Sequence, residues 1–134
     1  MECTRLMEKY TVFVADIAKS ETECRTVDDV LAVLTARIEA DPGVALLAVF
    51  DHYAHTRRRD GMIAPEIRAA KNLVFCFGPA LPDPRMLALR PRAIGVADLG
   101  DRFVVSFQEA PLAPANEAMR SWVRSLRTAD APVA

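Results

Sequence analysis

The chain has 134 residues, a length that suits a single domain and leaves little room for a second. Hydrophobic residues make up 51% of it and charged residues 26%, a balance that excludes disordered, collagen-like and coiled-coil proteins. The longest unbroken apolar run, Val44–Phe50, is much shorter than the ~20 residues of a membrane span. We therefore expect one domain over 1–134, with its core at about 10–127 and with ends, 1–9 and 128–134, that the sequence specifies poorly.

The charge and the cysteine content limit which kinds of partner and which cellular compartment we expect. The formal net charge is −1, so we expect neither a nucleic acid nor a membrane as partner. The charges are unevenly spread, because residues 1–56 carry 5 basic and 10 acidic side chains whereas residues 57–134 carry 12 and 8. Three cysteines cannot all pair within the chain, and the N-terminal residues lack the apolar stretch of a secretory signal. Both observations predict a cytoplasmic location.

The first half of the chain predicts a strand, a helix and a second strand. Alternating aromatic and β-branched residues predict a strand over 10–17. Thr26 and Asp29 have the spacing of a capping box, and apolar residues recur at helical spacing after them, so we expect a helix over 27–40. The apolar run Val44–Phe50 then predicts a central strand covered on both faces.

The elements of the second half are shorter and are bounded by proline, glycine or aspartate. In chain order we expect a polar loop over 51–61, a short helix over 65–70, a strand over 73–77, a short helix over 84–89, a hairpin of strands 93–97 and 102–108, and a last helix over 115–126.

This order of elements predicts an α+β fold. We expect a two-layer sandwich, in which the main helix lies on one face of a mostly antiparallel or mixed sheet of about five strands, in the order β-α-β-loop-β-(short α)-β-β-α. A doubly wound parallel sheet is not expected, because only the first connection contains a full crossover helix.

Both histidines of the chain lie in the segment Asp51–His55. If this segment is helical, His52 and His55 share a face and could hold a divalent metal ion, with Cys76 as an outside ligand, although the spacing matches no established metal motif. His52 could instead be a general base oriented by Asp51 or Glu109. The sequence favours a third interpretation, in which the histidines are structural, so we expect no cofactor and keep a divalent metal as the alternative.

Arg90 and Arg92 flank a proline just before a predicted strand. A rigid backbone would hold their two guanidinium groups near each other, in a geometry that could clamp the carboxylate or phosphate of a small anionic molecule. The alternative, which the sequence favours, is that they form ion pairs with Asp83, Asp98 or Asp101. No glycine-rich phosphate-binding motif is present.

Three stretches of the chain resemble a known family. They are Phe50-Asp51-His52 with His55, Asn72–Gly78, and Arg90–Val96 continuing through Gly100 to Pro111. Together they resemble the uncharacterised bacterial domain of unknown function three hundred and two, and a separately catalogued proteobacterial relative, over about residues 27–111. The resemblance implies a small sheet with one main helix packed on it, and it implies no reaction. His52 matches the Asp-His position of that family, whereas Arg90-Pro91-Arg92 departs from its more apolar Leu-Pro.

The sequence thus predicts a ligand- or partner-binding module with no established reaction. A metal-binding protein or a histidine-dependent enzyme that uses Asp51, His52 and His55 is the alternative. We expect the ligand-binding residues to be Arg90, Arg92, His52 and His55, in a pocket where the 51–55 loop and the end of the Cys76 strand meet. We also expect a homodimer, with the 73–77 strand, the helix of Trp122 or the exposed hairpin arm in the interface.

Overall fold

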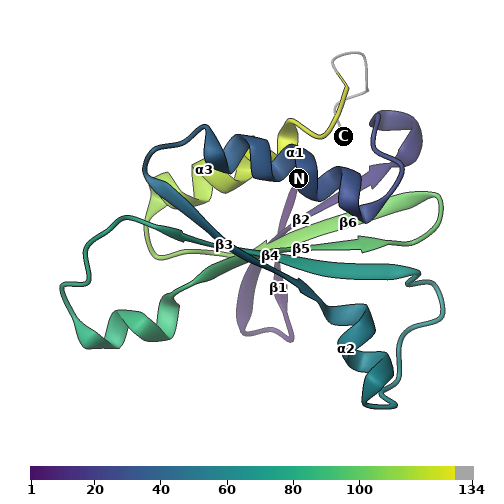
Figure 1. The fold of residues 1–134 in the computed structure, drawn as a ribbon, viewed down its shortest axis with the longest axis horizontal. Coiled ribbons are helices and arrows are strands. Elements are labelled where there is room, and N and C mark those ends of the chain that lie inside the picture. Colours follow the sequence, from purple (N-terminus) through teal and green to yellow (C-terminus); the bar gives the residue numbers. More distant parts are fainter. Residues whose placement is uncertain (129–134) are drawn as a thin grey trace.

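Six strands form one antiparallel sheet in a computed structural model, which describes residues 1–128 (Figure 1). The strand order is β1-β2-β6-β5-β4-β3. The strands are β1 (Glu2–Leu6), β2 (Tyr10–Ala18), β3 (Val44–Asp51), β4 (Ala69–Phe77), β5 (Arg92–Asp98) and β6 (Arg102–Gln108). The helices are α1 (Val27–Glu39), α2 (His52–Arg58) and α3 (Ala113–Arg124), with short 3-10 helices η1 (Lys19–Glu21) and η2 (Pro84–Leu89).

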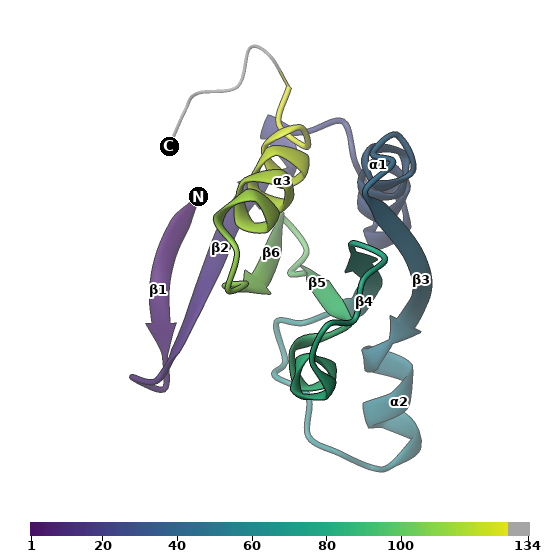
Figure 2. The same cartoon turned by 90° about the vertical axis from the view of Figure 1, so that its left-hand side faces the viewer.

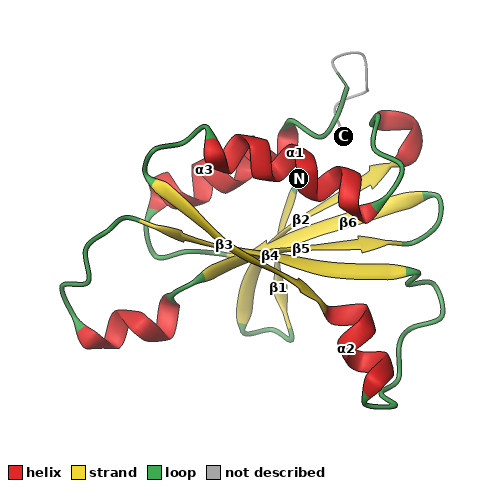
Figure 3. Ribbon diagram, in the orientation of Figure 1, coloured by secondary structure: helices red, strands yellow, loops and turns green. Residues whose placement is uncertain are grey.

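Helices α1 and α3 lie side by side on one face of the sheet, as Figure 3 shows, and this arrangement confirms the α+β class. Helix α1 begins where the sequence predicts. The side chain of Thr26 accepts a hydrogen bond from the Asp29 backbone N–H (3.0 Å), and the Asp29 carboxylate accepts one from the Thr26 N–H (3.1 Å). The apolar side of the helix then packs on the sheet, with Leu34 and Ile38 fully buried.

The core lies between these two helices and the sheet. Alternate residues of the inner strands point toward it, so Leu73 and Phe75 of β4 are fully buried. At one end of this layer, Phe77 stacks on Trp122 of α3, with ring centroids 5.7 Å apart and an interplanar angle of 4°. Phe75 meets the edge of the same indole at 5.4 Å. The end of β4 is therefore held to α3 by an aromatic cluster.

The strand Val44–Phe50 exists, but the prediction that it is central is wrong, because β3 is the last strand of the sheet. A bulge between Leu46 and Ala48 changes the alternation of side chains along it. Val44 and Leu46 pack against the core, whereas Leu47 and Val49 are exposed. The continuous apolar run of β3 therefore does not mean that both faces of this strand are buried.

Three other expectations are wrong. The predicted loop over 51–61 contains α2, which Asp51 caps by accepting a hydrogen bond from the Ala54 N–H (2.9 Å). The sequence does not predict this helix, because none of its residues is buried and it therefore has no apolar stripe at helical spacing. The predicted helix over 65–70 is absent, since β4 begins at Ala69. Residues Glu2–Leu6 form a sixth strand that their sequence does not signal.

The hairpin and the last helix agree with the sequence within two residues at each end. Within the part of the chain that the structure describes, no helix combines the length and the apolar character that a membrane crossing requires. The predicted poorly specified tail lies, from residue 129 onward, outside the described residues.

Candidate functional site

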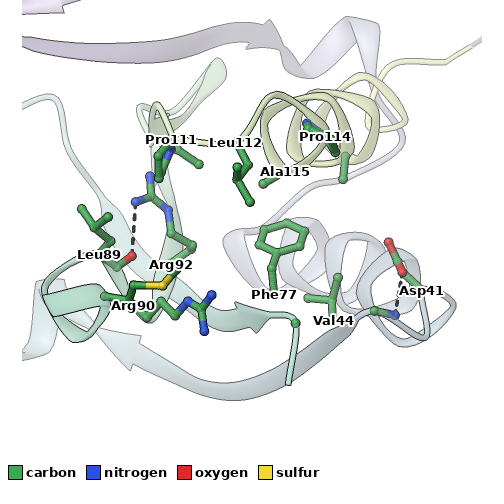
Figure 4. A pocket seen from close by; sticks show the side chains of 15 residues that line it. Asp41, Val44, Phe77, Leu89, Arg90, Arg92, Pro111, Leu112, Pro114 and Ala115 are labelled. Atoms are coloured by element: carbon green, nitrogen blue, oxygen red, sulfur yellow. Dashed lines mark hydrogen bonds between the residues drawn. The ribbon is translucent and has the colours of Figure 1, made fainter. Parts of the chain in front are cut away.

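A cavity of about 560 Å³ lies at the end of the sheet where β3 begins and β4 ends. Its other walls come from η2, the segment after it, and the start of α3 (Figure 4). Most of the lining is apolar: Val44, Phe77, Met86, Leu89, Ala110, Pro111, Leu112, Pro114, Ala115 and Ala118. The cavity thus joins three parts of the chain that are far apart in sequence.

Arg90 and Arg92 supply the positive charge of this cavity. Each is held by backbone carbonyls: Arg90 Nη1 donates to the Ala80 oxygen (2.5 Å), and Arg92 donates to the oxygens of Gln108 (2.6 Å, from Nη2) and Leu89 (3.4 Å, from Nη1). A guanidinium has five N–H donors, so both groups keep donors beyond these bonds. Both arginines line the same cavity, but their guanidinium groups bond to different backbone carbonyls, so the predicted clamp of two adjacent groups stays a prediction.

Neither arginine has a carboxylate partner within 4.0 Å among residues 1–128, since none of the ion pairs there includes them. The aspartates that we considered as partners are engaged elsewhere. They pair with other cations: Asp83 with Arg85 (2.6 Å), Asp98 with Lys19 (3.1 Å) and Asp101 with Arg102 (3.5 Å). Neither arginine therefore forms an ion pair within the described part of the chain.

Burial lowers the pKa of the Arg92 guanidinium, because a partly dry environment disfavours the charged form. An arginine side chain nonetheless stays protonated at neutral pH. Asp41 also lines the cavity and lies across it from the two arginines in Figure 4. One of its carboxylate oxygens accepts a hydrogen bond from the Gly43 N–H (2.9 Å).

The two histidines lie on α2, away from this cavity. Their ring centroids are 5.9 Å apart, and each ring contacts Phe50, at 5.5 Å for His52 and 5.3 Å for His55. His52 Nδ1 lies 3.1 Å from the Thr56 hydroxyl, a hydrogen bond along one helical turn. Among residues 1–128, no group of three or more His, Cys, Asp or Glu side chains has the geometry to hold a metal ion.

The structure does not bring the histidines together with Cys76 or with the arginines. Asp51, next to His52, pairs with Lys71 in the sheet, whereas Cys76 pairs with Ala45. Lys71 and Cys76 are five residues apart along β4, about 17 Å at ~3.4 Å per residue. The predicted pocket thus separates into two places, and only the end of β4 and the two arginines share the cavity.

A family model for a family of unknown function (DUF6858) matches residues 1–128. The chain belongs to this family. This family is catalogued under a different number from the domain of unknown function three hundred and two, which the short motifs resemble. The resemblance to that domain is therefore not confirmed. No curated protein and no solved structure matches the chain. The DUF6858 description names no reaction, so the chemistry of the cavity has to be inferred from its own residues.

Sequence reasoning missed most of the cavity wall. The sequence predicts the end of the strand that contains Cys76 and the two arginines as parts of the pocket, but it does not predict the side chains of α3 and of the segment around Leu112. The sequence does contain a signal for this wall, because large apolar residues stand in two proline-rich segments, 79–91 and 111–114, that lie outside the predicted strands and the two longer predicted helices. Leu89 is 45% exposed and Leu112 is 64% exposed, and both line the cavity.

Proposed function

We propose that this member of the DUF6858 family binds a small amphipathic anion, such as a medium-chain carboxylate, in the cavity beside Arg90 and Arg92. The anionic group would accept hydrogen bonds from the two guanidinium groups, and the apolar part would lie against Phe77 and Leu112. The observation that carries the proposal is the pair of arginines without an ion-pair partner in the described chain, at the wall of a mostly apolar cavity whose one carboxylate, Asp41, lies on the opposite side.

The size and lining of the cavity support this function. Ligand pockets in proteins typically enclose roughly 300–1,000 Å³ and combine apolar walls with a few well-placed polar groups. The cavity, at about 560 Å³, falls within that range. Leu89 and Leu112 give a further reason, because large apolar side chains exposed around a hollow are a feature of interaction sites.

The chemistry also sets the expected dependence of affinity on chain length. Burying one CH₂ group contributes roughly 0.8 kcal/mol, which is about a fourfold gain in affinity. A carboxylate should bind more tightly than the alcohol of the same length, because hydrogen bonds between charged groups contribute about 1.5–3 kcal/mol. Affinity should therefore rise with chain length until the cavity is full.

Trp122 offers a direct assay, because it is the single tryptophan of the chain and stacks on Phe77. Titration with carboxylates and alcohols of six to twelve carbons should change its emission in a saturable way, with a lower Kd for each carboxylate. Arg90→Gln should weaken carboxylate binding by about tenfold and alcohol binding hardly at all. Arg85→Gln is the matched control, since Arg85 lies on η2 but pairs with Asp83 outside the cavity.

A second variant tests the apolar wall separately. Ala115 lines the cavity, and Ala115→Phe should fill part of it and weaken the binding of both ligand series. Unchanged carboxylate affinity in Arg90→Gln would reject the role of the arginine. The absence of a saturable response to every chain length in the wild-type protein would reject the ligand class.

A further inference from the structure

The two edges of the sheet differ in how well they are protected. Strand β1 forms one edge; it is short and carries the charged residues Glu2 and Arg5. Strand β3 forms the other; it has eight residues and no charge before Asp51 at its end. Charged side chains and short length are common devices against edge-to-edge association. Only the β1 edge uses both of them.

The side chains along the β3 edge are apolar and accessible. Leu47 is 54% exposed, Val49 is 53% exposed and Phe50 is 40% exposed. The bulge leaves Leu47 without a partner residue in β4. Figure 2 shows β3 as the outermost strand, with α1 over the face of the sheet and α2 beyond the end of β3. Among residues 1–128, no strand pairs with its outer side.

We propose that this edge joins two copies of the chain, with β3 antiparallel to β3 of the second copy across a two-fold axis near Leu47 and Val49. An isologous contact of this kind pairs a surface with itself and closes at two subunits, whereas pairing of β3 with β1 would leave free edges and grow into a chain. The segment Val44–Phe50 suits self-pairing, because it carries no charge that would oppose its own copy across the axis.

The charges beyond the two ends of β3 complement each other in this arrangement. The chain before β3 is acidic, with Glu39 and Asp41, and α2 after it is basic, with Arg57 and Arg58. Antiparallel pairing brings the acidic end of one copy beside the basic end of the other. Within the described chain none of these four side chains forms an ion pair. Asp41 accepts a hydrogen bond from the Gly43 N–H, so Glu39, Arg57 and Arg58 are the side chains left to pair with the second copy.

The first test is the mass of the full chain in solution, measured by light scattering and sedimentation over a range of concentrations. The wild-type protein should form a dimer. Leu47→Lys and Val49→Lys should each shift it to the monomer, because each introduced charge would lie against the apolar edge of the second copy and lose water contact. Thr4→Lys, on the exposed β1 edge, is the control and should leave the dimer intact. Circular dichroism checks that each variant is folded.

The second test uses the charges. Glu39→Lys and Arg58→Glu should each weaken dimerisation roughly two- to tenfold, since each change acts twice in a symmetric dimer. The double variant should recover most of the affinity, which loss of folding would not allow. A wild-type monomer at every concentration, or a dimer that survives both lysine variants on β3, would overturn the proposal. Because these measurements need no ligand, they do not depend on the function of the cavity.

Discussion

Replacing Arg92 by methionine should show how much the hydrogen bonds of its guanidinium group stabilise the wall of the cavity. Arg92 links the end of η2 to the end of β6 through its hydrogen bonds to the Leu89 and Gln108 carbonyls. Methionine keeps the methylene stem and removes all five donors. Of the two bonds, the one to Gln108 is short at 2.6 Å, whereas the one to Leu89, at 3.4 Å, is long and contributes little.

The magnitude follows from the short bond. A hydrogen bond to a charged group contributes about 1.5–3 kcal/mol. Both side chain and carbonyl are near the surface, so water can replace part of the lost interaction, and we expect Arg92→Met to lower the free energy of unfolding by about 1–2 kcal/mol. Arg90→Met is the matched comparison. Its bond to Ala80 is equally short, but Ala80 lies in a loop outside the helices and strands that can shift when the bond is lost, whereas Gln108 ends β6. The expected loss is therefore smaller, about 0.5 kcal/mol or less.

Urea unfolding followed by circular dichroism measures both values. The slope with urea should stay the same in the wild-type protein and in the two variants, because the surface exposed on unfolding hardly changes. Equal stability of Arg92→Met and the wild-type protein would refute the reasoning that this side chain holds the cavity wall in place. Equal losses in the two variants would refute the distinction between them.

Three further predictions concern the fold. Leu34→Ala, at a fully buried position of α1, should reduce the unfolding free energy by about 2–5 kcal/mol in the same urea assay. Hydrogen bonds from backbone N–H groups lower the pKa of Asp29 from 3.8, so its stabilising contribution is present above that value and is lost as the pH falls through its lower pKa in the folded state. The stability difference between the wild-type protein and Asp29→Asn, measured from pH 6 to pH 2, should therefore shrink at the acid end. Gly100 has φ +98°, so Gly100→Ala should lower stability by about 1–2 kcal/mol, and an unchanged melting temperature would contradict this.

Elements that depend on neighbours in sequence could be predicted well. The capping residues of α1 and its apolar stripe are contained in residues 26–38, and both are realised in the structure. The hairpin of β5 and β6 is equally local. The place of β3 in the sheet is different, because it depends on which distant strands pair with β4. An apolar run is compatible with a central strand and with an apolar edge strand, so the sequence pattern could not distinguish the two positions.

The candidate site was only partly predictable for a related reason. We expected the carboxyl ends of the strands containing Phe50 and Cys76 to meet, as they would in a parallel sheet. Strands β3 and β4 are antiparallel, so these ends lie at opposite sides of the sheet. The two arginines could be identified because only Pro91 separates them in sequence. The opposite wall of the cavity comes from α3, and no local pattern links that helix to η2.

The composite origin of the cavity makes it a property of the native state alone. Its walls come from residues 41–44, 77–92 and 110–118, which are held near one another only when the chain is folded. A molecule that fills it therefore has no counterpart site in the unfolded chain, and its binding free energy adds to thermal stability. At a concentration one hundred times its Kd, such a molecule contributes about 2.7 kcal/mol. A melting-temperature screen of metabolite mixtures would thus register an occupant before its chemical identity is known.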